Sequence, residues 1–177
     1  MDENIKRNWQ ETRFRRPDSE AIEQVVSGKR TTALENLSRR YRRFSLIAFI
    51  MIIWSFFMFL SGTFPEEYRL PLSLSFGVYF LVCSTMDYWL YMGIRSIDIQ
   101  EMTVAQVIAK ALFYRKRHLQ FMAVLIPMAI ALVTYFVWTI TGDIYMIGGV
   151  AAGAIIGLAI GTRQFLRFMA DYRTLTE

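Results

Sequence analysis

The sequence predicts an all-α integral membrane protein with four transmembrane helices arranged as two hairpins. The chain of 177 residues is 54% hydrophobic, and its apolar residues gather in long runs instead of the spaced stripe of a soluble amphipathic helix. Each run reaches the roughly 17 residues that a helix needs to cross a hydrocarbon layer about 30 Å thick. The four runs are 44–60, 70–94, 119–141 and 144–161.

The basic residues divide almost completely between the two sides of this pattern. Of the twenty, eleven precede Phe44, five lie from Arg95 to Arg117 and three follow Gly161, which leaves Arg69 alone on the other side. Lys and Arg flanks are retained on the cytoplasmic side during insertion. We therefore predict a multi-pass protein of the bacterial inner membrane with both termini in the cytoplasm. The net charge of +5 then indicates membrane anchoring and no direct binding of nucleic acid.

This topology divides the chain into five parts. Residues 1–43 form a cytoplasmic N-terminal segment, 44–94 the first transmembrane hairpin and 95–118 a cytoplasmic linker helix. Residues 119–162 form the second hairpin, and 163–177 form a cytoplasmic tail. Because the first apolar run follows 43 largely polar residues, we expect it to remain as a transmembrane helix and not to be cleaved as a signal peptide.

The N-terminal segment is predicted to hold a short amphipathic helix. Asp18 has the chemistry of an N-cap, and Gly28 suits the left-handed residue that ends a helix. One apolar face is expected between them, made by Ala21, Ile22, Val25 and Val26.

A second helix is predicted to follow directly. Thr32 and Glu35 have the spacing of a capping box, so this helix should begin at Ala33 and run through the basic cluster into the first span. Its predicted inner side carries Leu34, Leu37 and Tyr41.

The linker between the second and third spans repeats the capping-box spacing at Thr103 and Gln106. The helix that follows should feed directly into the third span. Its apolar stripe is Val104, Val107, Ile108, Ala111 and Leu112.

Glycine recurs every fourth residue in the last span, at Gly149, Gly153, Gly157 and Gly161. Each four-residue step turns only about 40° around a helix, so the glycines form one groove that lets another backbone approach closely. We expect this groove to pack against another span of the same chain. A homo-oligomer interface and a pore lining are the alternatives.

Three further residues inside or beside the spans carry chemistry. Asp87 is the one acid within a predicted span, and we expect it to pair with a basic residue near the membrane surface, with proton or cation coupling as the alternative. His118, the single histidine, cannot form a metal site alone and is expected at the membrane interface. Cys83, the single cysteine, has no disulfide partner in the chain. No metal or other cofactor is predicted, and the chain has no catalytic motif, so we predict that it is not an enzyme.

Two basic clusters flank the first and third spans, where they are predicted to face anionic lipid headgroups at about 1 kcal/mol per residue. These lipid-facing residues are Arg39, Arg40, Arg42, Arg43, Arg115, Lys116 and Arg117.

Three stretches of the sequence carry a likeness to known proteins: Trp9-Gln10-Glu11, the run from Thr31 to Phe44, and Phe113 to His118. In these stretches and in its layout the chain resembles small multi-span inner-membrane proteins of Bacteroidetes bacteria. Such proteins are often encoded beside extracytoplasmic-function sigma factors. The resemblance implies a membrane-anchored regulator that holds a sigma factor through its cytoplasmic tail. The chain lacks the Cys and His pattern of zinc-binding anti-sigma domains.

From these features we predict a non-enzymatic regulatory or interaction protein whose N-terminal segment binds a cytoplasmic protein. That short segment exposes more apolar surface than it can bury by itself. The predicted partner-binding residues are Trp9, Phe14, Ile22, Val25 and Val26. The alternatives are a small transporter or channel subunit that uses Asp87, and a structural assembly partner in a larger membrane complex.

Overall fold

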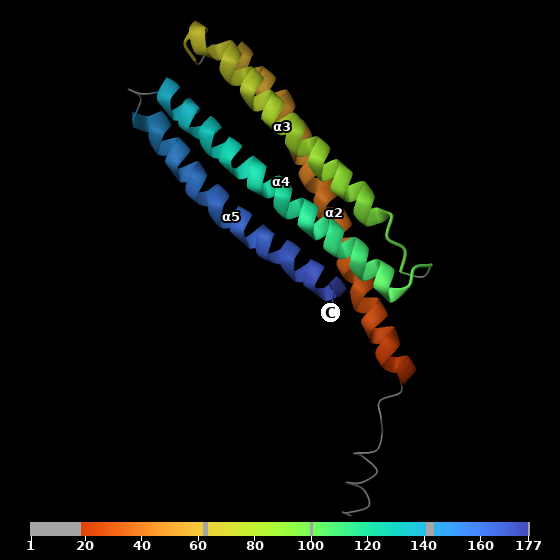
Figure 1. The fold of residues 1–177 in the computed structure, drawn as a ribbon. Coiled ribbons are helices and arrows are strands. Elements are labelled where there is room, and N and C mark those ends of the chain that lie inside the picture. Colours follow the sequence, from red (N-terminus) through yellow and green to blue (C-terminus); the bar gives the residue numbers. More distant parts are fainter. Residues whose placement is uncertain (1–18, 62–63, 100, 141–143, 177) are drawn as a thin grey trace, which may run out of the picture.

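The computed structural model describes residues 19–61, 64–99, 101–140 and 144–176 of the chain, and in that part it is entirely helical (Figure 1). Four long α-helices follow one another. They are α2 (Ser19–Leu60), α3 (Glu66–Arg95), α4 (Val104–Thr139) and α5 (Ile144–Thr176).

Each of the four helices is long and apolar enough to cross a membrane, which confirms the prediction of four candidate spans in an all-helical chain. The helices contain 42, 30, 36 and 33 residues. At 1.5 Å per residue they are about 45 to 63 Å long. A hydrocarbon layer is about 30 Å thick, so every helix extends beyond the apolar segment that it contains.

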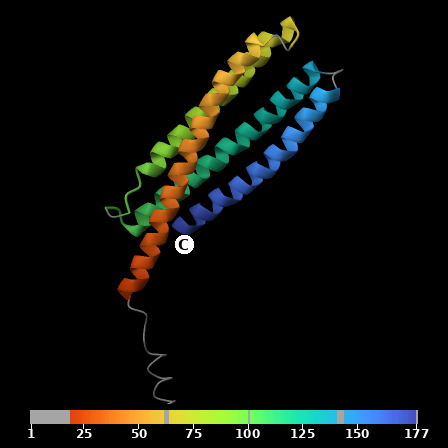
Figure 2. The same cartoon turned by 180° about the vertical axis from the view of Figure 1, so that it is seen from behind.

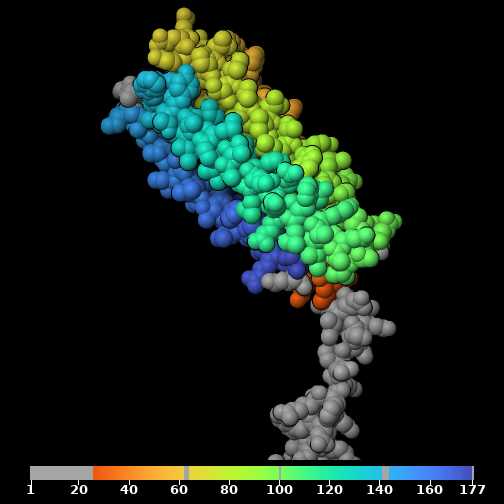
Figure 3. Space-filling model, in the orientation of Figure 1, coloured from red at the N-terminus to blue at the C-terminus, as the bar shows by residue number. Residues whose placement is uncertain are grey.

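The helices lie side by side as one bundle (Figures 1 and 2). In the space-filling view, α4 crosses the visible face with α3 on one side and α5 on the other (Figure 3). Serine pairs join α2 to α3: the Ser45 hydroxyl donates to the Ser84 carbonyl at 3.1 Å, and the Ser84 hydroxyl donates to the Ser45 carbonyl at 3.0 Å. Farther along, the Ser73 hydroxyl donates to the Ser55 carbonyl at 2.6 Å. Small hydroxyl side chains let helices approach closely and bond in an apolar medium.

Buried side chains gather at the two ends of the bundle. One end, which we call the basic end because Arg30, Arg40 and Arg95 lie there, has the larger core. That core consists of Ala33, Leu34, Leu37, Tyr41, Leu90, Ile94, Ile97, Val107, Ala111, Phe168, Tyr172 and Leu175. The opposite end is packed around Met58, Phe64, Leu72 and Ile140. Between the ends, the most apolar 18-residue windows of α4 and α5 contain no buried residue.

The N-terminal part of the structure corrects one prediction. Instead of ending at Gly28 and restarting at Ala33, α2 is continuous from Ser19 to Leu60. The Thr32 hydroxyl does not cap a new helix, because it donates to the Gly28 carbonyl one turn earlier at 2.9 Å. Thr31 bonds in the same way to the Ser27 carbonyl. Hydroxyls that bond four residues back are compatible with an uninterrupted helix.

Two other local predictions are confirmed. Thr103 is the N-cap of α4 and forms the reciprocal capping box with Gln106, and α4 then continues without a break through the third apolar run. In α2, the predicted inner residues Leu34, Leu37 and Tyr41 are all buried.

Candidate functional site

Four aromatic side chains from three helices form a buried cluster at the basic end, which we call the junction. It consists of Tyr41 on α2, His118 on α4, and Phe168 and Tyr172 on α5. The Phe168 ring centroid lies 4.8 Å from that of Tyr41 and 5.1 Å from that of His118. The Tyr41 and His118 centroids are 5.6 Å apart. None of the four side chains is more than 4% exposed, so the junction is where α2, α4 and α5 meet in the interior.

Some polar groups within and beside the junction form hydrogen bonds and others do not. The hydroxyl oxygens of Tyr41 and Tyr172 are 3.0 Å apart and share a hydrogen bond. The Arg40 Nη1 and Asp171 Oδ2 atoms are also 3.0 Å apart, but they are not aligned for a hydrogen bond. The Nε2 atom of His118 is buried and has no hydrogen-bond partner within the described ranges.

The junction lies outside the four apolar runs, and its titratable groups favour their neutral forms. Burial lowers the pKa of His118 to about 4, because an imidazolium would lose its hydration among the aromatic rings. Burial also raises the pKa of Tyr41 and Tyr172 above the usual value of a tyrosine. The pKa of Asp171 is raised above its usual value, because burial outweighs the opposing effect of the nearby Arg40. The ion pair beside the junction is Arg40 with Asp171.

His118 was expected at the membrane interface, and that depth stays a prediction; within the bundle it is 1% exposed and packs against Phe168. One sequence prediction is corrected. Arg40 was expected to face lipid, but it is half-buried, pairs with Asp171, and places its guanidinium 5.8 Å from the Phe168 ring centroid. The burial of both residues comes from contact with α5. The spacing of Phe168, Tyr172 and Leu175 is an amphipathic stripe that could have predicted this contact.

Asp87 does not form the ion pair expected for it. Among the described residues the ion pairs are Arg39–Glu35 and Arg40–Asp171. Asp87 is half-buried on α3. The preferred interpretation, a structural pair with a basic neighbour, is therefore not realised in this part of the chain, and coupling to a proton or cation stays a prediction.

The glycine groove on α5 lacks the within-chain partner predicted for it. A Cβ atom placed at Gly149, Gly153, Gly157 or Gly161 would meet nothing within 4 Å. The chain thus provides no helix to fill the groove where the structure describes it, and packing against a second copy stays a prediction. Gly93 on α3 differs, because a Cβ atom there would collide with the Tyr114 ring.

The structure describes only some of the predicted partner-binding residues. Trp9 and Phe14 lie outside the described residues. Ile22 and Val25 belong to α2, although their side chains are not described. Val26 is exposed on α2.

An open groove of about 420 Å³ runs beside this part of α2, between it and the end of α3. Its apolar floor includes Leu34, Ile94 and Ile97, and its rim carries Glu35 and Arg95. No group of three or more metal-ligating side chains is found in the parts of the chain that the structure describes.

Comparison of the chain with family models, curated proteins and solved structures found no match. The likeness to membrane proteins encoded beside sigma factors therefore stays a prediction.

The buried imidazole predicts a specific pH dependence of stability. His118 has a folded pKa of about 4, below the ordinary value near 6.5, so the unfolded chain binds the proton first as the pH falls. The free energy of unfolding should therefore drop by roughly 2 kcal/mol between about pH 7.5 and about pH 5. His118→Phe should remove this slope. Thermal unfolding of both proteins in detergent would measure it, and equal slopes would contradict the assignment.

The glycine contacts predict opposite outcomes for two substitutions. Gly93→Leu should strongly destabilise the bundle, because the new side chain would overlap the Tyr114 ring. Gly153→Leu should leave the thermal stability of the monomer unchanged, since nothing in the described chain lies within 4 Å of its Cβ position. Unfolding midpoints of the two variants would test this. Chemical cross-linking would show whether Gly153→Leu dissociates an oligomer, as a groove between two copies requires.

Proposed function

We propose that the protein is a membrane-anchored regulatory or interaction protein, without enzymatic activity, that binds a cytoplasmic protein through its N-terminal segment. In this proposal the helices form two transmembrane hairpins, the basic end faces the cytoplasm, and both termini lie there. The partition of basic residues supports this orientation.

The observation that carries the proposal is the continuity of α2. The helix passes from the first apolar run into the large core at the basic end, where Leu37 and Tyr41 are fully buried. It then continues beyond the bundle as a stalk that ends at Ser19 (Figures 1 and 2). A binding segment attached to this stalk is therefore joined to the membrane bundle by an unbroken helix.

The chemistry of the stalk suits a protein partner. Val26 is exposed on it, and Lys29 beside it is exposed and basic. Preceding residues include Trp9 and Phe14 among several arginines. Apolar anchors within a basic segment fit a partner with an acidic and partly apolar surface, and such segments commonly fold on binding. The sigma factor implied by the resemblance is the partner we favour.

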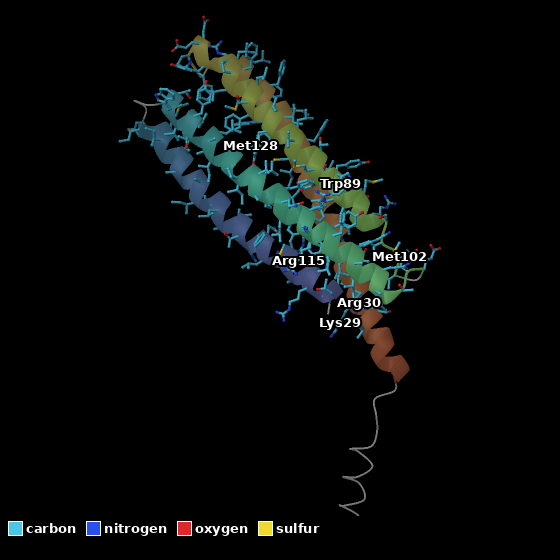
Figure 4. The ribbon with its side chains drawn as sticks, in the orientation of Figure 1. Lys29, Arg30, Trp89, Met102, Arg115 and Met128 are labelled. Atoms are coloured by element: carbon cyan, nitrogen blue, oxygen red, sulfur yellow. The ribbon has the colours of Figure 1, made fainter. Side chains whose placement is uncertain are left out.

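The geometry supports a transporter less well. Coupled transport needs polar groups that line a route at the depth of the membrane. The cavity described at that depth is an open groove between α3 and α4, lined mainly by apolar residues such as Leu74, Val78 and Met128. Met128 and Trp89 mark the α3–α4 side of the bundle in Figure 4. Asp87 is not among the residues that line this groove.

The orientation can be tested by labelling. In a Cys83→Ala background, cysteine placed at Glu66 should react in intact cells with a membrane-impermeant thiol reagent, whereas cysteine at Glu101 should react only after the membrane is opened. Both positions are exposed, so burial would not prevent the reaction. Labelling of position 101 but not position 66 in intact cells would reverse the proposed orientation.

Partner binding can be tested with the full chain in detergent or lipid discs. Trp9→Ala, or Ile22→Asp combined with Val25→Asp, should weaken capture of a purified sigma factor by roughly 2 kcal/mol if these side chains are binding hot spots. Titration by calorimetry would measure the affinity.

Thr174→Ala is a suitable control, because Thr174 is exposed on α5, a different helix from the proposed binding segment, and its hydroxyl bonds within its own helix. Equal affinity of all variants, or binding that requires anionic lipid and no protein, would refute the proposed role of the N-terminal segment.

A further inference from the structure

Exposed basic residues stand next to the junction on each helix that builds it. Arg42 and Arg43 follow Tyr41 on α2, and Lys116 and Arg117 precede His118 on α4. On α5, Arg167 precedes Phe168 and Arg163 lies about one turn earlier. We call these six side chains the collar: Arg42, Arg43, Lys116, Arg117, Arg163 and Arg167.

The junction fixes the three parts of the collar at one level of the bundle. The Phe168 ring is 4.8 Å from the Tyr41 ring, 5.1 Å from the His118 ring and 5.9 Å from the Phe44 ring, centroid to centroid. Residues adjacent in sequence to these four must lie at the same height along their helices. Packing of the aromatic core thus places basic residues of three helices at about one level of the bundle, and like charges repel one another.

Few acidic side chains of the described residues pair with these cations. The two ion pairs found in the described ranges join Arg39 to Glu35 and Arg40 to Asp171, and neither includes a collar residue. Arg117 donates to the Gln120 side chain at 3.3 Å, but that amide carries no charge. The acid nearest in sequence to Phe168 is Asp171, which Arg40 already uses.

The collar also lies at the boundary of the apolar runs. Phe44 and Leu119 open the first and third runs and Gly161 closes the last, each within a few residues of the collar. The half-buried Arg115 lies on the same part of α4, near α5 (Figure 4). This is the depth at which phospholipid phosphates lie, and guanidinium groups bind phosphate through paired, charge-assisted hydrogen bonds.

We propose that anionic phospholipid headgroups bind the collar and hold α5 against α2 and α4. The lipid phosphate supplies the negative charge that the collar lacks, so binding favours the state in which the three helices are together. Anionic lipid is then a structural ligand of the junction, which goes beyond general attraction of a basic protein to a membrane.

The test compares thermal unfolding of the full chain in discs of pure phosphatidylcholine and in discs that also contain phosphatidylglycerol. The wild-type midpoint should rise by several degrees in the anionic discs. Arg163→Gln with Arg167→Gln should lose more than half of that rise, and Arg42→Gln with Arg43→Gln should do the same. The control, Lys29→Gln with Lys110→Gln, removes two charges outside the collar and should keep the full rise.

Two further measurements decide between remaining explanations. Arg163→Lys with Arg167→Lys keeps the charge, so it should retain most of the rise even if the glutamine variant folds poorly. Soluble glycerol phosphate added to phosphatidylcholine discs should have little effect, since it lacks the membrane anchor. An equal midpoint for the wild type in both discs, an equal rise in collar and control variants, or full stabilisation by soluble glycerol phosphate would overturn the proposal.

Discussion

The aromatic contacts of the junction bury α5 most deeply against the rest of the bundle, while Met146, Ile147 and Val150 make shallower contacts at the opposite end. The buried residues of α5 are Phe168, Tyr172 and Leu175, all near its C-terminal end. The most apolar window of α5 contains no fully buried residue. In water such a helix would expose a large apolar surface, but in lipid that surface costs nothing, and helix association must come from packing and hydrogen bonds. The junction supplies both, through ring contacts and the bond between Tyr41 and Tyr172.

The sequence was sufficient for features that depend on local pattern. Four apolar runs predicted four candidate spans, and the Thr103–Gln106 spacing predicted the start of α4. The same spacing failed at Thr32, because a threonine hydroxyl can cap a new helix or bond back within an existing one. The hydroxyl bonds back within a helix when the preceding residues are already helical, and it caps a new helix when they are not. The sequence pattern alone could not show whether the residues before Thr32 are helical.

The junction escaped prediction because it depends on contacts between distant parts of the chain. Tyr41 and Tyr172 are separated by 131 positions in the sequence. The residues around Arg40 in the sequence do not indicate that it will form an ion pair with Asp171. The charge pattern therefore led us to predict that Arg40 faces lipid along with its basic neighbours. The same pattern gave Arg42 and Arg43 the correct exposed surroundings. Charge pattern therefore does not predict which cations have partners within the protein.

The proposed partner-binding residues Ile22 and Val25 lie on the same helix as Arg42 and Arg43 of the proposed collar, which links the two proposals physically. Ser19 and Tyr41 belong to the same unbroken α2, and the stalk meets the large core about two turns before the collar begins. A ligand changes a second ligand's affinity only if it distinguishes between two states of the protein. Docked and released forms of α5 would be two such states, because α5 contacts α2 at Tyr41 and Phe44. A partner that prefers one form must then alter lipid affinity, and lipid must alter partner affinity by the same factor.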